Sequence, residues 1–158
     1  MAGPSTDQIL RKISEARELY HRLILVAGPP GSGKTAELKE VSASTSAPLV
    51  NVNLELSRRM LDLTERRRAL QLPRLLGKIV GEATGELVLL DNIEILFDVH
   101  LKQDPLRLLQ GLSRNKTVVA AWNGSIADGH LTYAVPDHPE YRRYPVRDFL
   151  VASPEVTT

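Results

Sequence analysis

Residues 23–35, LILVAGPPGSGKT, constrain the fold more than any other part of this chain. The second half of this segment matches the pattern G-x-x-x-x-G-K-[ST], and an apolar run directly precedes it. In such a segment a strand leads into a glycine-containing turn, and consecutive backbone N–H groups can then point at a polyphosphate because glycine lacks a Cβ. The positive end of the following helix adds to the attraction. We therefore predict a phosphate-binding loop.

The usual roles of this motif predict a site for a nucleotide polyphosphate and Mg²⁺. The Lys34 ammonium reaches the β and γ phosphates, and we expect this ammonium to lie in solvent when the site is empty. The Thr35 hydroxyl takes one coordination position on Mg²⁺. The residues predicted to bind the nucleotide are Gly28, Pro29, Pro30, Gly31, Ser32, Gly33, Lys34, Thr35 and Ala36.

The segment 86–97, ELVLLDNIEILF, predicts the remaining metal ligand. Its short continuous apolar run is typical of a strand that helices bury on both faces, and Asp91 follows at the carboxyl end. An aspartate that caps a helix would give the same sequence, an apolar run followed by Asp. With a phosphate loop upstream we favour a Walker B carboxylate that supplies an oxygen ligand to the Mg²⁺ held by Thr35.

Composition narrows the other possibilities. A chain of 158 residues fits one domain, residues 1–158, and its 20 Lys+Arg against 19 Asp+Glu give no sign of a protein that coats nucleic acid. The absence of cysteine excludes disulfides and thiolate metal sites, and the histidines show no ligand spacing. The amino terminus has no apolar signal core, and no apolar run approaches the roughly 20 residues that cross a bilayer. We expect a cytoplasmic protein.

Hydrophobic periodicity predicts alternating strands and helices. This alternation implies an α/β fold with a central parallel sheet and helices on both faces. We expect an amphipathic helix over 6–20, with a Ser5–Gln8 capping box, before a nucleotide-binding core over 23–135. The core should contain helices at 35–44, at 72–83 with Pro73 in its first position and from 104–105 onward, and strands at 49–55, 117–122 and 130–135. The tail over 136–158 should be irregular, with one possible strand at 146–151 and a frayed end.

Two further features each allow two interpretations. Asn123 follows a predicted central strand, where it could contact the γ-phosphate or the attacking water, or could simply form an Asn-Gly turn. The segment 57–72 is rich in arginine, which suits either a solvated helix face or a contact with nucleic-acid backbone or a neighbouring subunit's nucleotide. The arginines concerned are Arg58, Arg59, Arg66, Arg67 and Arg68.

Three features together resemble the AAA+ and STAND-like branch of P-loop ATPases: GPPGSGKT, LLDNIEILF and the polar strand end at Asn123. The resemblance covers about residues 23–135. It implies a three-layer fold in which an extra strand separates the phosphate-loop strand from the strand that ends at Asp91. A closer resemblance is to the BrxF family, small P-loop proteins of type 3 BREX phage-defence systems. It rests on the short length, the helix directly before the loop and the Asp-Asn-Ile-Glu sequence. That resemblance implies a role beside other components of a defence complex.

The chain departs from the AAA+ pattern at one catalytic position. AAA+ members place a catalytic glutamate directly after the Walker B aspartate, whereas this chain has Asn92, which can orient water but cannot accept its proton. Glu94 and Glu55 are the acids that could substitute, and we prefer Glu94. The sequence also stops without the helical lid domain and its arginine, so we expect an arginine supplied in trans. The candidates are Arg114, then Arg142 and Arg143, then Arg58 and Arg59.

These patterns leave three functions open. The first is an ATPase or ATP switch of low intrinsic turnover that self-associates when ATP is bound. The second is a non-catalytic ATP-binding scaffold, in which bound nucleotide stabilises one assembly. The third is a small-molecule kinase, which would need an acceptor pocket and an arginine-bearing lid. A GTPase is disfavoured because residues 115–118, NKTV, do not match the guanine-binding pattern N-K-x-D.

Overall fold

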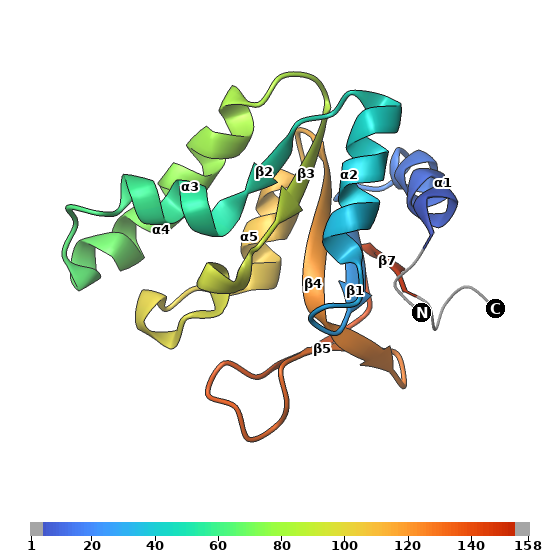
Figure 1. The fold of residues 1–158 in the computed structure, drawn as a ribbon. Helices are drawn as coiled ribbons and strands as arrows, with labels where there is room; N and C mark the ends of the chain where they lie inside the picture. Colours follow the sequence, from blue (N-terminus) through green and yellow to red (C-terminus); the bar gives the residue numbers. More distant parts are fainter. Residues whose placement is uncertain (1–4, 154–158) are drawn as a thin grey trace.

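A sheet forms the middle layer of the structure, and helices pack on both of its faces (Figure 1). The computed structural model describes residues 5–153. In chain order the elements, with η1 and η2 being 3₁₀ helices, are α1 (Thr6–Ala16), β1 (Leu23–Gly28), α2 (Lys34–Thr45), β2 (Leu49–Asn51), α3 (Val52–Arg59), α4 (Glu65–Glu82), β3 (Leu87–Asp91), η1 (Glu94–Phe97), η2 (Val99–Leu101), α5 (Pro105–Leu112), β4 (Thr117–Ala127), β5 (His130–Tyr133), β6 (Arg142–Pro145) and β7 (Leu150–Ala152).

The parallel part of the sheet has the strand order β2-β3-β4-β1-β7. β4 therefore lies between β1 and β3, which is the arrangement that the resemblance to AAA+ proteins implies. β1 pairs with β4 from Leu23 opposite Val118 to Gly28 opposite Asn123. β3 pairs with the other side of β4 in the same direction, so Asp91 also ends at the carboxyl edge.

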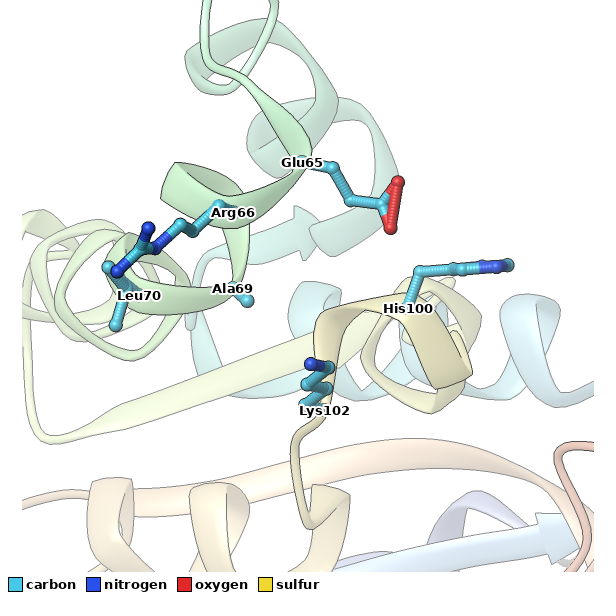
Figure 2. A pocket seen from close by; sticks show the side chains of 6 residues that line it. All are labelled: Glu65, Arg66, Ala69, Leu70, His100 and Lys102. Atoms are coloured by element: carbon cyan, nitrogen blue, oxygen red, sulfur yellow. The ribbon is translucent and has the colours of Figure 1, made fainter.

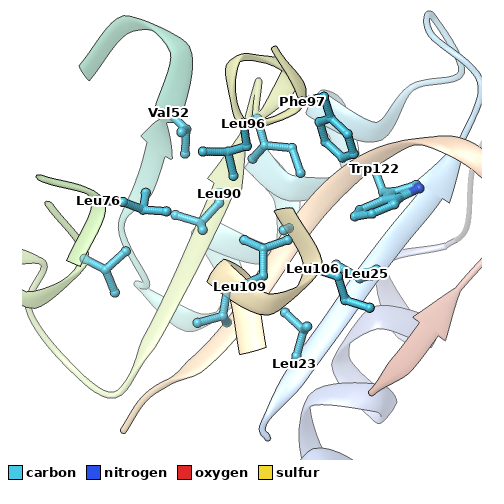
Figure 3. Close-up of a cluster of buried hydrophobic side chains, with 14 of the residues drawn as sticks. Leu23, Leu25, Val52, Leu76, Leu90, Leu96, Phe97, Leu106, Leu109 and Trp122 are labelled. Carbon is cyan, nitrogen blue, oxygen red and sulfur yellow. The ribbon is translucent and has the colours of Figure 1, made fainter. Parts of the chain in front are cut away.

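The two faces of the sheet are buried by different helices. In β1, Leu23 and Leu25 belong to a cluster with side chains of α3, α4 and α5 (Figure 3), whereas Ile24 and Val26 pack with α1 and α2. All four side chains are fully buried. Burial on both faces explains why this strand is a continuous apolar run instead of an alternating one. The predicted three-layer α/β fold is confirmed.

Capping side chains begin several of the helices. The Ser5 hydroxyl accepts a hydrogen bond from the backbone N–H of Gln8 at 3.1 Å, and Asp104 caps α5 as predicted. The second half of the predicted capping box is wrong: the Gln8 side-chain oxygen, which would accept from the Ser5 N–H, has no hydrogen-bond partner within residues 5–153, and the side-chain nitrogen donates to the Ser153 carbonyl. α1 also ends at Ala16, before the expected residue 20. Within residues 5–153, no helix has the length and hydrophobicity to cross a membrane.

The strand predicted over 49–55 is wrong in its second half. β2 ends at Asn51, whose side chain accepts a hydrogen bond from the backbone N–H of Leu54 at 3.0 Å and so begins α3. Asparagine favours this capping role because its side-chain oxygen satisfies an N–H that the helix leaves free. Val52 and Leu56 are fully buried on one side of α3, which is helical spacing. Glu55 therefore lies on a helix and not at a strand end.

The helix predicted to begin at Pro73 begins earlier. α4 starts at Glu65, after Thr64 as its cap, and Pro73 lies in its interior. Proline has no N–H, so it leaves the carbonyl group four residues earlier, that of Ala69, without its usual helical donor. The Gln103 side-chain amide donates to this carbonyl at 2.8 Å. A distant residue thus offsets what the proline removes.

The chain after Asn123 is more regular than predicted. β4 continues past Asn123 to Ala127, and the chain turns at residues 128–129 into β5, so an Asn-Gly turn at 123–124 is wrong. The tail expected to be irregular contains β6, which pairs with β5, and β7, which pairs in parallel with β1. β7 begins at Leu150, later than the strand expected over 146–151. The predicted frayed end concerns residues 154–158, outside the described residues.

Gly124→Ala should destabilise the protein by about 1–3 kcal/mol, the usual cost of overpacking a close contact. A Cβ at this position would lie 1.7 Å from the Thr132 carbonyl oxygen in β5. Urea unfolding measures the effect. Gly77→Ala in α4 is the matched control, because a Cβ there meets nothing within 4 Å and should stabilise the helix by about 0.5–1 kcal/mol. A Gly124→Ala variant as stable as the parent would contradict the close approach of β5.

Candidate functional site

A pocket of about 360 Å³ lies at the carboxyl edge of the parallel strands. The loop after β1, the segment after β3 and the middle of β4 form its walls. Open α/β sheets bind ligands at this edge. The lining residues are Pro30, Gly31, Gly33, Lys34, Thr35, Asp91, Asn92, Glu94 and Asn123.

The phosphate loop presents free donors to this pocket. Gly33 has a φ of 92°, a left-handed conformation that glycine adopts at no steric cost, and it stands directly before α2. No side chain caps the first turn of α2. The N–H groups of that turn are therefore free to bind an anion, and the helix dipole favours one there. Ala36 lies in the same turn and is exposed.

Lys34 is buried in the loop, so the expectation that its ammonium lies in solvent is wrong. Its side chain is only 6% exposed, and the ammonium donates to the carbonyls of Gly28 at 2.8 Å and Pro29 at 2.7 Å. The Ser32 hydroxyl is a third acceptor at 3.3 Å. Burial lowers the pKa of Lys34, while the negative charge of Glu94, and after it that of Asp91, acts in the opposite direction. The loop's own oxygens thus hold the cation that is expected to bind phosphates.

Thr35 and Asp91 meet across the pocket. The Thr35 hydroxyl donates to Asp91 Oδ2 at 2.6 Å, and the other carboxylate oxygen accepts from the backbone N–H of Asn92 at 2.9 Å. Hydroxyl and carboxylate oxygens are hard ligands of the kind that Mg²⁺ prefers. This pair of neighbouring oxygens beside a phosphate loop therefore fits the predicted Mg²⁺ site.

Glu94 is held at the pocket by two asparagine side chains. Its Oε2 accepts from the Asn123 amide at 2.7 Å, and its Oε1 accepts from the Asn53 amide at 3.3 Å. Asn53 is fixed in turn, because its side-chain oxygen accepts from the Ile95 N–H at 2.8 Å and its N–H donates to the Asn92 carbonyl at 2.8 Å. α3, β4 and η1 therefore converge on one carboxylate.

Two of the predicted catalytic residues lie elsewhere. Glu55 lies on α3, where its carboxylate is 3.7 Å from the guanidinium groups of both Arg58 and Arg59, and it does not line the pocket. Arg114 precedes β4, and its guanidinium carbon lies 4.9 Å from the ring centre of Tyr20. Because β4 begins at the opposite edge of the sheet and reaches the pocket only at Asn123, Arg114 is remote from the pocket of its own chain.

Sequence reasoning missed Asn53 as part of the site. It had placed Asn53 near the end of a longer strand, without a partner. The sequence does contain a signal for this position, because Asn51 is a good helix cap. A helix that begins after Asn51 places Asn53 in its first turn, beside the strand that ends at Asp91. Asn92, which the sequence marked as unusual, has a φ of 54°, a conformation that asparagine adopts more readily than most residues.

A larger pocket of about 550 Å³ lies between α4 and η2, away from the phosphate loop (Figure 2). Its lining combines side chains of both charge signs with Ala69 and Leu70, and the N-terminus of α4 beside it is already capped by the Thr64 side chain. The lining residues are Glu65, Arg66, Ala69, Leu70, His100 and Lys102. Polyphosphate chemistry therefore belongs to the smaller pocket, where backbone donors, a lysine and two hard oxygen ligands converge.

The arginine-rich segment is partly neutralised within the chain. Arg59 lies 3.3 Å from Glu82 as well as near Glu55. Arg68 donates to the carbonyls of Leu63 and Leu61 and so fixes the turn between α3 and α4. These contacts favour a structural role for Arg59 and Arg68.

Comparison with known families agrees with this geometry. Residues 24–119 match the model described as ATPase family associated with various cellular activities (AAA). The chain belongs to the AAA family. The match includes the phosphate loop, Asp91 and Glu94, and it ends within β4, before Asn123. Members of the AAA family are nucleotide-binding ATPases, usually with Mg²⁺. A search of curated proteins finds no match to this AAA chain.

Lys34→Ala should weaken ATP binding by at least about 2 kcal/mol, roughly thirtyfold, because a buried cation that pairs with phosphate is removed. Isothermal titration with ATP and Mg²⁺ measures the affinity. Lys39→Ala removes an exposed lysine from the same helix and should leave the affinity unchanged. Circular dichroism should find both variants folded. If Lys34→Ala bound ATP as tightly as the parent, the phosphate-loop assignment would be wrong.

Proposed function

We propose that this AAA protein is a Mg²⁺-dependent ATPase of low intrinsic turnover that acts as an ATP-dependent assembly switch. One observation carries the proposal: Glu94, and not the residue directly after Asp91, presents a carboxylate to the pocket, and Asn53 and Asn123 hold both of its oxygens. A carboxylate at this place supports hydrolysis. Its hydrogen bonds support a slow reaction.

The proposed roles follow from the contacts of the pocket. Lys34 exchanges the Gly28 and Pro29 carbonyls for phosphate oxygens, and the free N–H groups of α2 bind the same phosphates. Thr35 and Asp91 would hold Mg²⁺ in place of their mutual hydrogen bond. When bound, Mg²⁺ neutralises the negative charge that develops on the phosphates. Asn123, which lines the same pocket, would orient water near the γ-phosphate.

Glu94 is the proposed general base that accepts a proton from the attacking water. Both oxygens of the Glu94 carboxylate already accept a hydrogen bond from an asparagine amide. One of these amides must be displaced before the carboxylate can bond the attacking water, which slows the reaction. Together with Asn92 in the usual acid position, this predicts a turnover number well below the typical range of about 1–10³ s⁻¹.

The switch role is proposed to work through self-association. A nucleotide at the open edge of the sheet leaves its γ-phosphate accessible to a second subunit, and an arginine supplied in trans raises the rate in other P-loop systems by about 10³–10⁵. Arg143 is the freest of the candidates: its side chain is exposed and makes no hydrogen bond or ion pair within the described part of the chain. Arg142 instead donates to the Gln103 carbonyl at 2.7 Å.

The finer proposal is that this switch acts within a BREX phage-defence complex, beside its other components. Support for it is the resemblance of the Asp-Asn-Ile-Glu segment and of the short chain to BrxF. A direct contact with nucleic acid is part of the proposal, through the arginines of α3 and α4. Arg66 and Arg67 are its best candidates, because Arg58, Arg59 and Arg68 have partners within the chain.

A non-catalytic ATP-binding scaffold is the second candidate function. The observation that favours it is the same pair of amides, because Glu94 must give up a donor before it can accept a proton from water. A small-molecule kinase has less support, since no arginine of residues 5–153 lines the pocket.

Glu94→Gln should lower the phosphate-release rate of the protein at least about tenfold. A general base typically contributes about 10²–10⁴-fold, and the two amide bonds of Glu94 favour a smaller effect. ATP affinity should change little, because Gln keeps the size of Glu94. Glu55→Gln is the matched control: its carboxylate lies outside the pocket, so the rate should stay near that of the parent. The scaffold function is supported if neither the parent nor Glu94→Gln releases phosphate above background. A larger loss in Glu55→Gln would reverse the assignment of the two acids.

ATP with Mg²⁺ should increase the mass of the protein in solution, which light scattering measures over a range of protein concentrations. An arginine in trans is then tested by mixing Lys34→Ala with Arg143→Ala. The mixture should regain part of the phosphate-release activity that both variants lack, because one intact site forms at their shared interface. Arg11→Ala, on the exposed side of α1, is the control and should keep full activity alone. A protein that stays monomeric with ATP and Mg²⁺ at every concentration would rule the arrangement out.

A further inference from the structure

A β-hairpin extends the sheet beside the nucleotide pocket. The second half of β4 pairs with β5 in antiparallel fashion, from Gly124 opposite Tyr133 to Ala127 opposite His130, and β6 pairs with β5 in turn. This hairpin lies after residue 119, where the match to the AAA family ends. Its role therefore has to be argued from the contacts of this chain.

Tyr133 of the hairpin stacks on the same short helix that presents Glu94. The rings of Tyr133 and Phe97 are nearly parallel, with centroids 3.5 Å apart and an interplanar angle of 7°. Phe97 is the last residue of η1 and Glu94 is the first. Side chains three residues apart in a 3₁₀ helix lie on the same side. The ring of Tyr133 therefore supports the side of η1 from which Glu94 reaches the pocket.

β5, the strand that carries Tyr133, also contacts β4 on both sides of Asn123. Before Asn123, the Trp122 indole donates to the Thr132 carbonyl at 3.0 Å. After it, Gly124 approaches Thr132 so closely that no side chain would fit. Trp122 meets both Phe97 and Tyr133 edge to face, at 5.1 and 6.0 Å between centroids.

Tyr133 is itself firmly placed. Its side chain is 6% exposed, and it belongs to the hydrophobic cluster between the sheet and helices α3, α4 and α5. Burial raises the pKa of Tyr133, and the negative charges of Glu94 and Glu140 raise it further. Tyr133 thus stays neutral near the carboxylate of Glu94.

We propose that Tyr133 is a positioning residue for hydrolysis: its ring, stacked on Phe97, holds η1 so that the Glu94 carboxylate stays against Asn123 in the nucleotide pocket. The proposal rests on the proposed role of Glu94 as general base. It assigns to the hairpin a part of the catalytic geometry that the rest of the sheet does not supply. A shift of about 1 Å at a reacting group can cost about 10²-fold in rate, so a loose η1 would affect kcat strongly.

The test compares Tyr133→Leu, Tyr133→Phe and Tyr144→Leu. Tyr144 is the matched control: its ring also meets Trp122, at 6.0 Å, but its hydroxyl bonds Asp104 and no ring contact joins it to Phe97 among the described residues. Tyr133→Leu should lower kcat at least about tenfold, with a KM for ATP within about twofold of the parent, because the phosphate loop is untouched. Tyr133→Phe keeps the stack and should restore kcat. Tyr144→Leu should lower the melting temperature without this selective loss of kcat.

Hydrogen exchange separates the positioning role from the role of Glu94. The Ile95 N–H donates to the Asn53 side chain, so its protection reports whether η1 is held in place. Tyr133→Leu should reduce that protection selectively, and Tyr144→Leu should not. Unchanged protection of Ile95 in Tyr133→Leu, or an equal loss of protection and kcat in both leucine variants, would overturn the positioning proposal. Lost protection with an unchanged kcat would support positioning and contradict the base role of Glu94 instead.

Discussion

The parallel pairing of β1, β4 and β3 determines where every group of the pocket lies. In this register Gly28 stands opposite Asn123, and Asp91 ends β3 at the same edge. The interior side chains of these strands are fully buried on both faces, so a shift of register by one residue would exchange the two sets of core contacts. The hydrophobic core therefore fixes the relative positions of the phosphate loop, the carboxylate and the amide.

Within that frame, the groups expected to bind a ligand bond one another. Lys34 bonds the loop carbonyls, Thr35 bonds Asp91, and Glu94 bonds Asn53 and Asn123. The charged side chains of the pocket are thereby paired, which avoids the cost of leaving a partly buried charge without a partner. A ligand has to replace these bonds with better ones. Charge-assisted bonds to phosphate meet that condition for the ammonium of Lys34. An exchange of the bonds of Glu94 would link nucleotide binding to the positions of α3, η1 and β4, because Glu94 of η1 bonds Asn53 of α3 and Asn123 of β4.

The sequence predicted the parts of the site that depend on local patterns, and it missed those that depend on distant contacts. The phosphate loop and Asp91 follow apolar runs and were recognisable from spacing alone. The end of β2 at Asn51 was missed because capping competes with strand alternation over only a few residues. The interior position of Pro73 depends on Gln103, which is distant in sequence, and the burial of Lys34 depends on the conformation of its own loop. β7 was obscured because a strand of three residues beside β1 gives almost no periodic signal.

The proposed function depends on a Mg²⁺ site that Thr35 and Asp91 would form beside the phosphates of ATP. Its most direct test is the affinity for ATP, measured by isothermal titration with Mg²⁺ and with EDTA, for the parent, Asp91→Asn and Asp98→Asn. The Asp91→Asn substitution keeps the size of the side chain and a hydrogen-bond acceptor but removes the charge, whereas Asp98 caps η2 outside the pocket. Mg²⁺ should tighten ATP binding at least about tenfold, or 1.4 kcal/mol, in the parent and in Asp98→Asn, and Asp91→Asn should lose most of this gain. Equal ATP affinity with and without Mg²⁺ in the parent, or a full Mg²⁺ effect in Asp91→Asn, would contradict it.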